Sequence, residues 1–204
     1  DYVAGHSVGE YAAFGAAGYL SIEDTVKLTS ARGKFMNEVA EKVNGGMAAI
    51  IGLDSDKIIE ELKKVDGVVE AVNFNEPKQT VIAGEKDAIA KACEVLKEAG
   101  ARRAMPLAVS GPFHSSLMKE AGEKLKEEAE KYNFTMTDIK LVANTTANIL
   151  TSVDEVKDEI YRQSFGPVKW VDTIKKLKSE GVITIYEIGP GKVLAGLIKK
   201  IDKE

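Results

Sequence analysis

Residues Gly5-His6-Ser7-Val8-Gly9 match the pattern G-x-S-x-G and lie between a short apolar run and a helix-like stretch. This pattern is typical of a nucleophile elbow, a sharp turn from strand to helix that holds a serine hydroxyl at its tip. The glycines leave room for the backbone and for a substrate, and the first helical N–H groups point at a developing oxyanion. A pentapeptide of this kind also arises by chance in glycine-rich turns, so other residues must decide.

A serine nucleophile needs a base, and the sequence contains two histidines, His6 and His114. Because His6 is adjacent to Ser7, its side chain should point away from the hydroxyl at a sharp turn. His114 lies in a Gly- and Pro-containing loop between a predicted strand and a predicted helix, where parallel sheets present catalytic groups. We interpret His114 as the candidate base; the alternative is a loop histidine that caps the next helix.

Composition restricts the other classes of function. The chain has 204 residues, 44% of them hydrophobic, which predicts a folded soluble protein. The net charge of -4, with both signs mixed along the chain, argues against nucleic acid as a partner. The single cysteine, Cys93, fits a core position and a reducing compartment, so we expect a cytoplasmic protein. Two histidines and one cysteine are too few for a typical zinc or iron site, and no apolar run is long enough for a membrane span. No metal, cofactor or membrane is therefore expected.

The first part of the chain is predicted to be helical after the elbow. One helix should follow Ser7 and end at Gly18, and Ser21 should cap a second helix that continues through Thr25 to about Val43. Arg32 lies in this second helix among the apolar positions expected to face a core, which are Val26, Leu28, Phe35, Met36 and Val39.

The pattern changes after Asn44-Gly45-Gly46. The expected order is strand, helix, strand, strand, helix, strand, with the elements at 47–53, 54–65, 68–73, 79–83, 87–99 and 103–109. This order is the split βαβ or ferredoxin-like arrangement, which we interpret as an inserted subdomain over residues 46–109.

The remaining chain alternates helices with isolated apolar strands. Ser115 or Ser116 should begin a helix to about Tyr132; further strands are expected at 140–143 and 184–188, and helices at 153–165, 168–180 and 191–201. Such alternation predicts an α/β fold with a parallel sheet covered on both faces. We assign residues 1–45 and 110–204 to this larger domain.

Five motifs are spread over nearly the whole chain: Gly5-His6-Ser7-Val8-Gly9-Glu10, Ala31-Arg32-Gly33-Lys34-Phe35-Met36, Val72-Asn73-Phe74-Asn75, Gly111-Pro112-Phe113-His114-Ser115 and Glu187-Ile188-Gly189-Pro190-Gly191-Lys192-Val193-Leu194. In type and in order they resemble the motifs of the malonyl-CoA:acyl carrier protein transacylase family of type II fatty acid synthesis. The resemblance implies an α/β-hydrolase-like domain with an inserted ferredoxin-like subdomain. It also implies ping-pong transfer of a malonyl group from coenzyme A to the phosphopantetheine thiol of acyl carrier protein.

The resemblance assigns roles to particular residues. Ser7 would be the nucleophile and His114 its base, then the acid for the leaving thiol. Arg32 would bind the free carboxylate of the malonyl group, for which a planar guanidinium is suited. Val8 would donate one backbone N–H to the oxyanion, and the backbone carbonyl of Gln163 would orient the histidine. Because that role does not involve the side chain, Gln163→Ala is expected to be mild.

Further residues are assigned to the substrate cleft and to docking by their type and their position. His6, Asn73, Asn75 and Phe113 are expected at the substrate cleft, and the bulk of Phe113 favours malonyl over methylmalonyl groups. The pair Arg102-Arg103 is a candidate docking site for acyl carrier protein or for the phosphates of coenzyme A. The alternatives are turn-forming asparagines and a solvated arginine pair.

The family's second oxyanion donor is a glutamine in a Gly-Gln-Gly motif, which these 204 residues do not contain. We therefore expect about 85 further residues upstream in the natural protein, from the usual size of such a domain, and weak or no activity from these residues alone. Two other classes stay open. One is a serine hydrolase or thioesterase, and the other is a non-catalytic fragment that docks acyl carriers.

Overall fold

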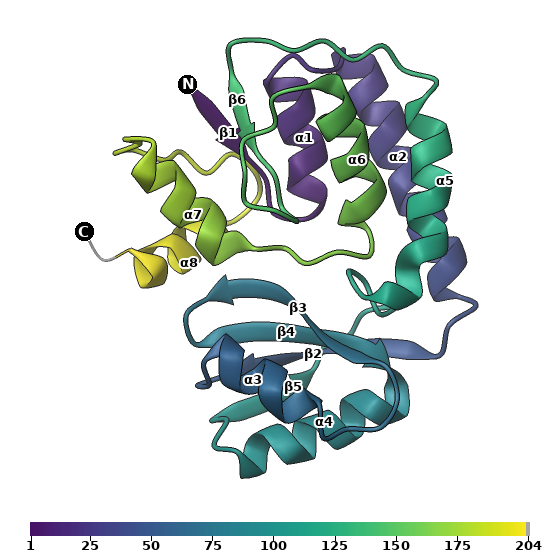
Figure 1. The fold of residues 1–204 in the computed structure, drawn as a ribbon, viewed down its shortest axis with the longest axis vertical. Coiled ribbons are helices and arrows are strands. Elements are labelled where there is room, and N and C mark those ends of the chain that lie inside the picture. The colour runs from purple at the N-terminus through teal and green to yellow at the C-terminus, as the bar shows by residue number, and fades with distance from the viewer. Residues whose placement is uncertain (203–204) are drawn as a thin grey trace.

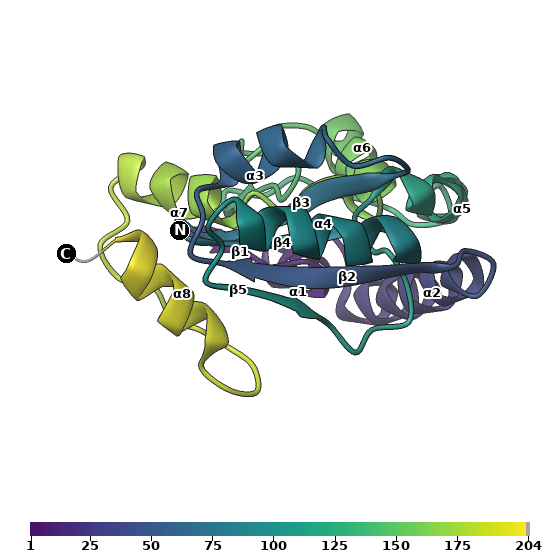
Figure 2. The same ribbon diagram turned by 90° about the horizontal axis from the view of Figure 1, so that it is seen from below.

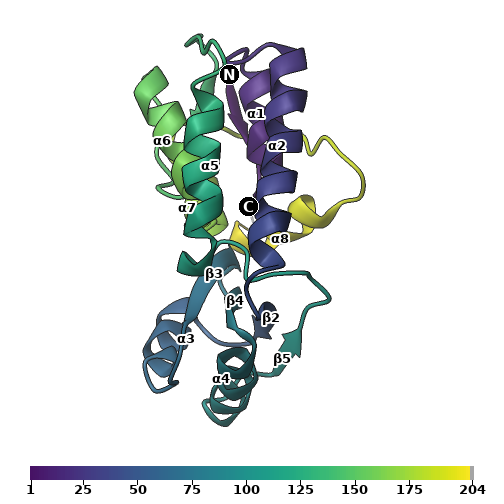
Figure 3. The same ribbon diagram turned by 90° about the vertical axis from the view of Figure 1, so that its right-hand side faces the viewer.

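The computed structural model describes residues 1–202, which form two lobes (Figures 1 and 3). The larger lobe contains β1 (Tyr2–Ala4), α1 (Val8–Ala16), α2 (Ile22–Ala40), the 3₁₀ turn η1 (Ser116–Met118), α5 (Lys119–Ala129), β6 (Lys140–Val142), α6 (Val153–Gln163), α7 (Trp170–Ser179) and α8 (Val193–Ile201). The smaller lobe contains β2 (Gly45–Ile51), α3 (Ser55–Leu62), β3 (Val69–Glu76), β4 (Gln79–Glu85), α4 (Lys86–Glu98) and β5 (Arg103–Pro106).

The smaller lobe is a four-stranded antiparallel sheet in the order β3-β4-β2-β5, with α3 and α4 over one face (Figure 2). This order is the ferredoxin-like one that the sequence predicts. Apolar side chains of both helices, such as Ile58 and Leu96, pack on Ile50 and Ile82 of the sheet. The opposite face carries a second apolar cluster, which Phe113 from the larger lobe joins.

The larger lobe pairs β1 with β6 in parallel and surrounds them with helices. Its core lies between α1, α2, α5, α6 and β6, and its fully buried members include Tyr11, Phe14, Leu28, Leu125, Leu141 and Ile160. The fold is α/β with a parallel sheet and an inserted ferredoxin-like subdomain, as predicted. Backbone hydrogen bonds also join the two lobes. Val168 N–H donates to the Val72 carbonyl at 2.8 Å, and Phe74 N–H donates to the Val168 carbonyl at 2.9 Å.

Helix α2 shows how local sequence sets the position of Arg32. Ser21 Oγ accepts a hydrogen bond from Asp24 N–H at 3.0 Å, which is the predicted N-cap. Leu28, Arg32 and Met36 recur every four residues and share the buried face. The expectation that Val26 faces the core was wrong, because it is 64% exposed. Each helical residue turns by about 100°, so Val26 lies across the helix from Leu28.

Residues 184–188 are not a strand in the structure, contrary to the sequence prediction. Ile183 and Ile188 are 98% and 96% exposed. A strand requires a neighbour for its backbone groups, and none of the strands within residues 1–202 pairs with this segment. The strand expected over 103–109 is also shorter and ends at Pro106.

None of the helices in the described residues combines the length and apolarity that crossing a membrane requires. Within residues 1–202 there is also no group of three or more His, Cys, Asp or Glu side chains arranged to hold a metal ion.

The two glycines of the elbow have different structural roles. A Cβ on Gly5 would lie 2.0 Å from the carbonyl carbon of Gly9, whereas a Cβ on Gly9 would meet no atom within 4 Å. Only Gly5 therefore permits the close approach of β1 to the first turn of α1.

We predict that Gly5→Ala lowers the free energy of unfolding by about 1–3 kcal/mol, because the new methyl group overlaps backbone that cannot move aside. Gly9→Ala is the matched control and should leave stability unchanged or raise it by up to about 1 kcal/mol, because alanine favours helix over glycine. Urea unfolding of the full natural chain measures both. Equal losses in the two variants would contradict this prediction.

Candidate active site

Ser7 lies at the tip of the turn between β1 and α1. Its backbone has φ 55° and ψ -113°, a left-handed conformation that a residue with a side chain rarely adopts. The side chain of Asn144, just beyond β6, supports the turn from both sides. Its Oδ1 accepts from Ser7 N–H at 2.8 Å, and its Nδ2 donates to the Gly5 carbonyl at 2.6 Å. These bonds stabilise the strained backbone that presents the hydroxyl.

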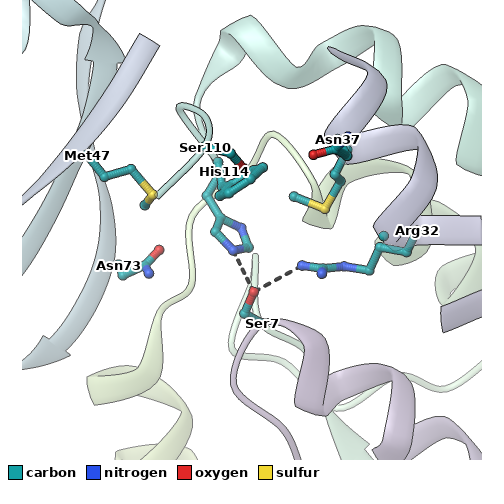
Figure 4. Close-up of a pocket in the computed structure, with 10 residues that line it drawn as sticks. Ser7, Arg32, Asn37, Met47, Asn73, Ser110 and His114 are labelled. Atoms are coloured by element: carbon teal, nitrogen blue, oxygen red, sulfur yellow. Dashed lines mark hydrogen bonds between the residues drawn. The ribbon is translucent and has the colours of Figure 1, made fainter. Parts of the chain in front are cut away.

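The hydroxyl of Ser7 meets two other side chains (Figure 4). His114 Nε2 lies 2.7 Å from Ser7 Oγ, and Arg32 Nη2 donates to the same oxygen at 3.0 Å. His114 Nδ1 lies 2.8 Å from the Gln163 carbonyl, which can only accept a hydrogen bond. The proton of a neutral imidazole is therefore on Nδ1, and Nε2 is left as the acceptor for the serine O–H.

His114 is a buried loop residue, and its backbone has a positive φ of 67°. Burial and, next, the positive charge of Arg32 lower the pKa of His114 to about 3. The side chain is therefore neutral at physiological pH, which is the form that accepts a proton from a serine.

Arg32 is only 7% exposed, and it reaches the site from α2. Its Nε donates to Gln163 Oε1 at 3.2 Å and its Nη2 to Ser7 Oγ, so both of these acceptors are uncharged. Burial lowers the pKa of Arg32, but a guanidinium remains protonated. A buried positive charge with neutral partners is a binding site for an anionic group.

A pocket of about 350 Å³ opens beside Ser7 between the two lobes. Arg32 and Met36 line it from α2, and Met47 and Asn73 line it from the sheet of the smaller lobe (Figure 4). The predicted cleft residue Phe113 is also part of its wall. The pocket therefore combines one cationic group with apolar surfaces.

The other two predicted cleft residues lie apart from this pocket and contact each other. His6 Nε2 is 2.7 Å from Asn75 Oδ1, and the His6 ring packs edge-on against Trp170 with 5.6 Å between ring centroids. Burial lowers the pKa of His6. As expected, His6 is not the residue that contacts the serine hydroxyl; that contact belongs to His114.

Arg102 and Arg103 are exposed at the start of β5 and do not reach the pocket. Arg103 pairs with Ile51, four residues along β2 from the pocket residue Met47. At the rise of a β-strand this separation is about 13 Å. Val8 is the first residue of α1, next to Ser7, and is half exposed.

Gln163 was expected to act through its backbone alone, but its side chain also connects three parts of the site. Its Nε2 donates to the Ser7 carbonyl and, at 3.0 Å, to Glu10 Oε2, while its Oε1 accepts from Arg32. Removing this side chain leaves buried groups without partners, so Gln163→Ala should not be mild.

Sequence reasoning missed Asn144, Glu10 and Glu159 as residues that support the site. The sequence did hold one signal for Glu10, because it is the single charged residue within the apolar stretch of α1. In the structure it is fully buried. Charged residues are rarely buried without a specific partner. Asn144 and Glu159 carry no comparable local signal, since Asn144 bonds Gly5 and Ser7 and Glu159 lies beside Glu10, all far away in the sequence.

Comparison with known proteins adds independent evidence. A family model described as acyl transferase domain matches residues 1–203. The malonyl CoA-acyl carrier protein transacylase of Bacillus subtilis (strain 168) is 45% identical over 206 residues, which cover 100% of this chain and 65% of that protein. The chain thus spans somewhat less than two thirds of the length of this curated relative.

Solved structures agree with the sequence comparison. An acyl-carrier-protein S-malonyltransferase from Burkholderia pseudomallei has a TM-score of 0.96 at 48% identity, covering 99% of this chain and 66% of that one. A malonyl-transacylase in complex with an acyl carrier protein of a type II polyketide synthase has a TM-score of 0.95 at 42% identity, covering 98% and 65%.

Proposed function

This chain belongs to the acyl transferase domain family, and we propose that its protein transfers a malonyl group from coenzyme A to the phosphopantetheine thiol of acyl carrier protein. The observation that carries the proposal is the convergence of a serine hydroxyl, a neutral imidazole and a buried guanidinium at one oxygen. The first two groups are what acyl transfer needs, and the third selects an acyl group that ends in a carboxylate.

In the first half-reaction, Ser7 Oγ attacks the thioester carbonyl of malonyl-CoA while His114 Nε2 takes the hydroxyl proton. The N–H of Val8 belongs to the first turn of α1 and is free of helical bonding, so it is the backbone donor proposed for the oxyanion. When the C–S bond breaks, the imidazolium gives its proton to the coenzyme A sulfur. The products are free coenzyme A and a malonyl ester of Ser7.

In the second half-reaction, the thiol of acyl carrier protein attacks the ester carbonyl, and His114 takes the thiol proton. The same proton returns to Ser7 Oγ as the ester bond breaks. The carbonyl of Gln163 keeps the imidazole oriented during both steps. A neutral carbonyl stabilises the imidazolium less than a triad carboxylate would, so the imidazolium formed here is a strong acid for the leaving group.

Arg32 is proposed to bind the distal carboxylate of the malonyl group. In the free site its Nη2 donates to Ser7 Oγ, and acylation of that oxygen leaves the guanidinium free to bond a carboxylate through two parallel N–H groups. Phe113 in the pocket wall is proposed to disfavour an α-branched acyl chain. Asn73 lines the pocket and is a candidate substrate contact, while His6 and Asn75 are proposed to support the cleft through their mutual hydrogen bond.

The proposal extends to partners and organisation. Arg102 and Arg103 are exposed and are proposed to dock acyl carrier protein or coenzyme A phosphates from outside the pocket. The steps above need no metal or cofactor, and we propose a cytoplasmic location. We also propose residues 46–109 as the inserted subdomain and residues 1–45 and 110–204 as the larger domain, with the first strand of the subdomain beginning one residue earlier, at Gly45.

Two alternatives use the same residues. In a serine hydrolase or thioesterase, water would deacylate Ser7. In a docking fragment, Ser7 would not become acylated. The buried guanidinium beside the serine, together with the Gln163 carbonyl in place of a triad carboxylate, argues against a general hydrolase. Malonyl-CoA hydrolysis in the absence of acyl carrier protein separates the hydrolase from the transferase.

Incubating the full natural chain with malonyl-CoA should add one malonyl group to Ser7, detected by mass spectrometry of peptides. Arg32→Ala should slow this acylation about 10- to 100-fold, the effect of losing a hydrogen-bonded charge, and should leave acetylation by acetyl-CoA nearly unchanged. Arg162→Ala is the matched control, since Arg162 is an exposed arginine paired with Asp158. The absence of a Ser7 adduct in the wild-type chain would contradict the proposal.

The pH dependence of Ser7 acylation should reflect the low pKa of His114. The neutral imidazole is the base, and with a pKa of about 3 it stays neutral as the pH falls. We predict that kcat/KM for acylation is nearly constant between about pH 8 and pH 5. Arg32→Ala should move the acid limb to higher pH, because it removes a positive charge beside the imidazole. A wild-type rate that halves near pH 6.5, the ordinary histidine value, would contradict this prediction.

A further inference from the structure

Two carboxylic side chains are buried together beneath the serine turn. Glu10, in the first turn of α1, is 0% exposed, and Glu159, in α6, is 3% exposed. The mechanism proposed above uses neither of them. Buried carboxyl groups are costly unless their oxygen atoms are bonded, so their contacts indicate what they do.

Each carboxyl group is fully engaged. Glu10 Oε1 accepts from Asn144 N–H at 2.9 Å, and Glu10 Oε2 accepts from Gln163 Nε2 at 3.0 Å. Glu159 Oε1 accepts from Thr145 N–H at 2.9 Å, and its Oε2 bonds the Thr145 hydroxyl. Burial raises the pKa of both carboxyl groups, that of Glu10 well above its usual range, and the nearby Glu159 raises the pKa of Glu10 further.

These contacts determine which way the Gln163 amide points. Its NH₂ group lies between two acceptors, the Ser7 carbonyl and Glu10 Oε2, and its oxygen faces the N–H of Arg32 Nε. A flipped amide would place its NH₂ against the Arg32 N–H and its oxygen against the Ser7 carbonyl. Both contacts would then join groups of the same kind and be repulsive.

We propose that Glu10 is a positioning residue that holds the Gln163 amide in one orientation and, through it, holds the Arg32 guanidinium aimed at the acyl carboxylate. This inference rests on the proposed function of Arg32. Glu10 touches no substrate and acts through two intermediate contacts, from Glu10 Oε2 to Gln163 and from Gln163 Oε1 to Arg32 Nε. Glu159 contacts Thr145 and raises the pKa of the Glu10 carboxyl group.

The structure offers a matched pair of isosteric variants. In Glu10→Gln the new amide has one acceptor and one NH₂ where two N–H donors, from Asn144 and Gln163, each need an acceptor. Gln163 must then lose a bond or flip against Arg32. In Glu159→Gln the amide oxygen still accepts from Thr145 N–H, and the NH₂ can donate to Glu10 and to the threonine hydroxyl. The two variants therefore make the same chemical change, but only Glu10→Gln disturbs the hydrogen bonds of Gln163.

The test compares malonylation and acetylation of Ser7 in the full natural chain. Glu10→Gln should lower kcat/KM for malonyl-CoA about tenfold, the scale of one lost hydrogen bond to a charged group, and leave acetyl-CoA within about threefold. Glu159→Gln should keep both rates within about threefold. The ratio of the two rates is the decisive readout, because a general structural defect lowers both substrates together.

A second variant keeps the inference testable if Glu10→Gln does not fold. Gln163→Met removes the amide but keeps the backbone carbonyl that orients His114. Because the amide also bonds the Ser7 carbonyl, both rates should fall, and malonylation should fall about tenfold further than acetylation. An unchanged ratio in either folded variant, or an equal change in Glu159→Gln, overturns the positioning role while Arg32-dependent malonylation still supports the proposed function. A wild-type chain without malonylation overturns both.

Discussion

The geometry of the site depends on the left-handed backbone at Ser7 and on the Asn144 side chain that supports it. Asn144 bonds the residues on both sides of the turn and comes from the end of β6, the strand paired with β1. Its own N–H is held by Glu10 in the helix that follows the turn. The serine hydroxyl is thus placed by a closed set of contacts among β1, α1 and β6, and loss of the Asn144 side chain would move the hydroxyl relative to His114.

The electrostatic character of the site follows from the burial of Arg32 and His114. A guanidinium and an imidazole lie within hydrogen-bonding distance of one oxygen, and their proximity favours the neutral form of His114. A carboxylate partner for Arg32 would neutralise its charge and reduce its attraction for an anionic acyl group. The structure instead gives Arg32 an amide oxygen, and burial raises the pKa of the nearby acid Glu10 well above its usual range, which favours its uncharged form. The positive charge consequently remains available to a ligand.

Much of this architecture was predictable from sequence because its signals are local. The elbow glycines, the Ser21 cap and the strand and helix order of the smaller lobe are each specified by residues within a few positions of one another. The Gln163 side chain and the Glu10–Glu159 pair were not predicted, because their contacts join residues about 150 positions apart. Val26 and residues 184–188 were mispredicted for a related reason. An apolar residue type shows that burial is favourable, but not which side of a helix or strand has a neighbour to bury it.

The two lobes contribute different groups to the pocket. Ser7, His114, Arg32 and Gln163 all come from the larger lobe, whereas Met47 and Asn73 face them from the sheet of the smaller one. The position of that sheet is fixed close to the site by the backbone bonds between β3 and Val168. Side chains on its inner face can therefore change the width of the pocket without altering the serine, its base or the guanidinium. The charge in the pocket thus comes from the larger lobe alone, whereas its width depends on both lobes, because Met36 and Phe113 of the larger lobe line it together with Met47 and Asn73.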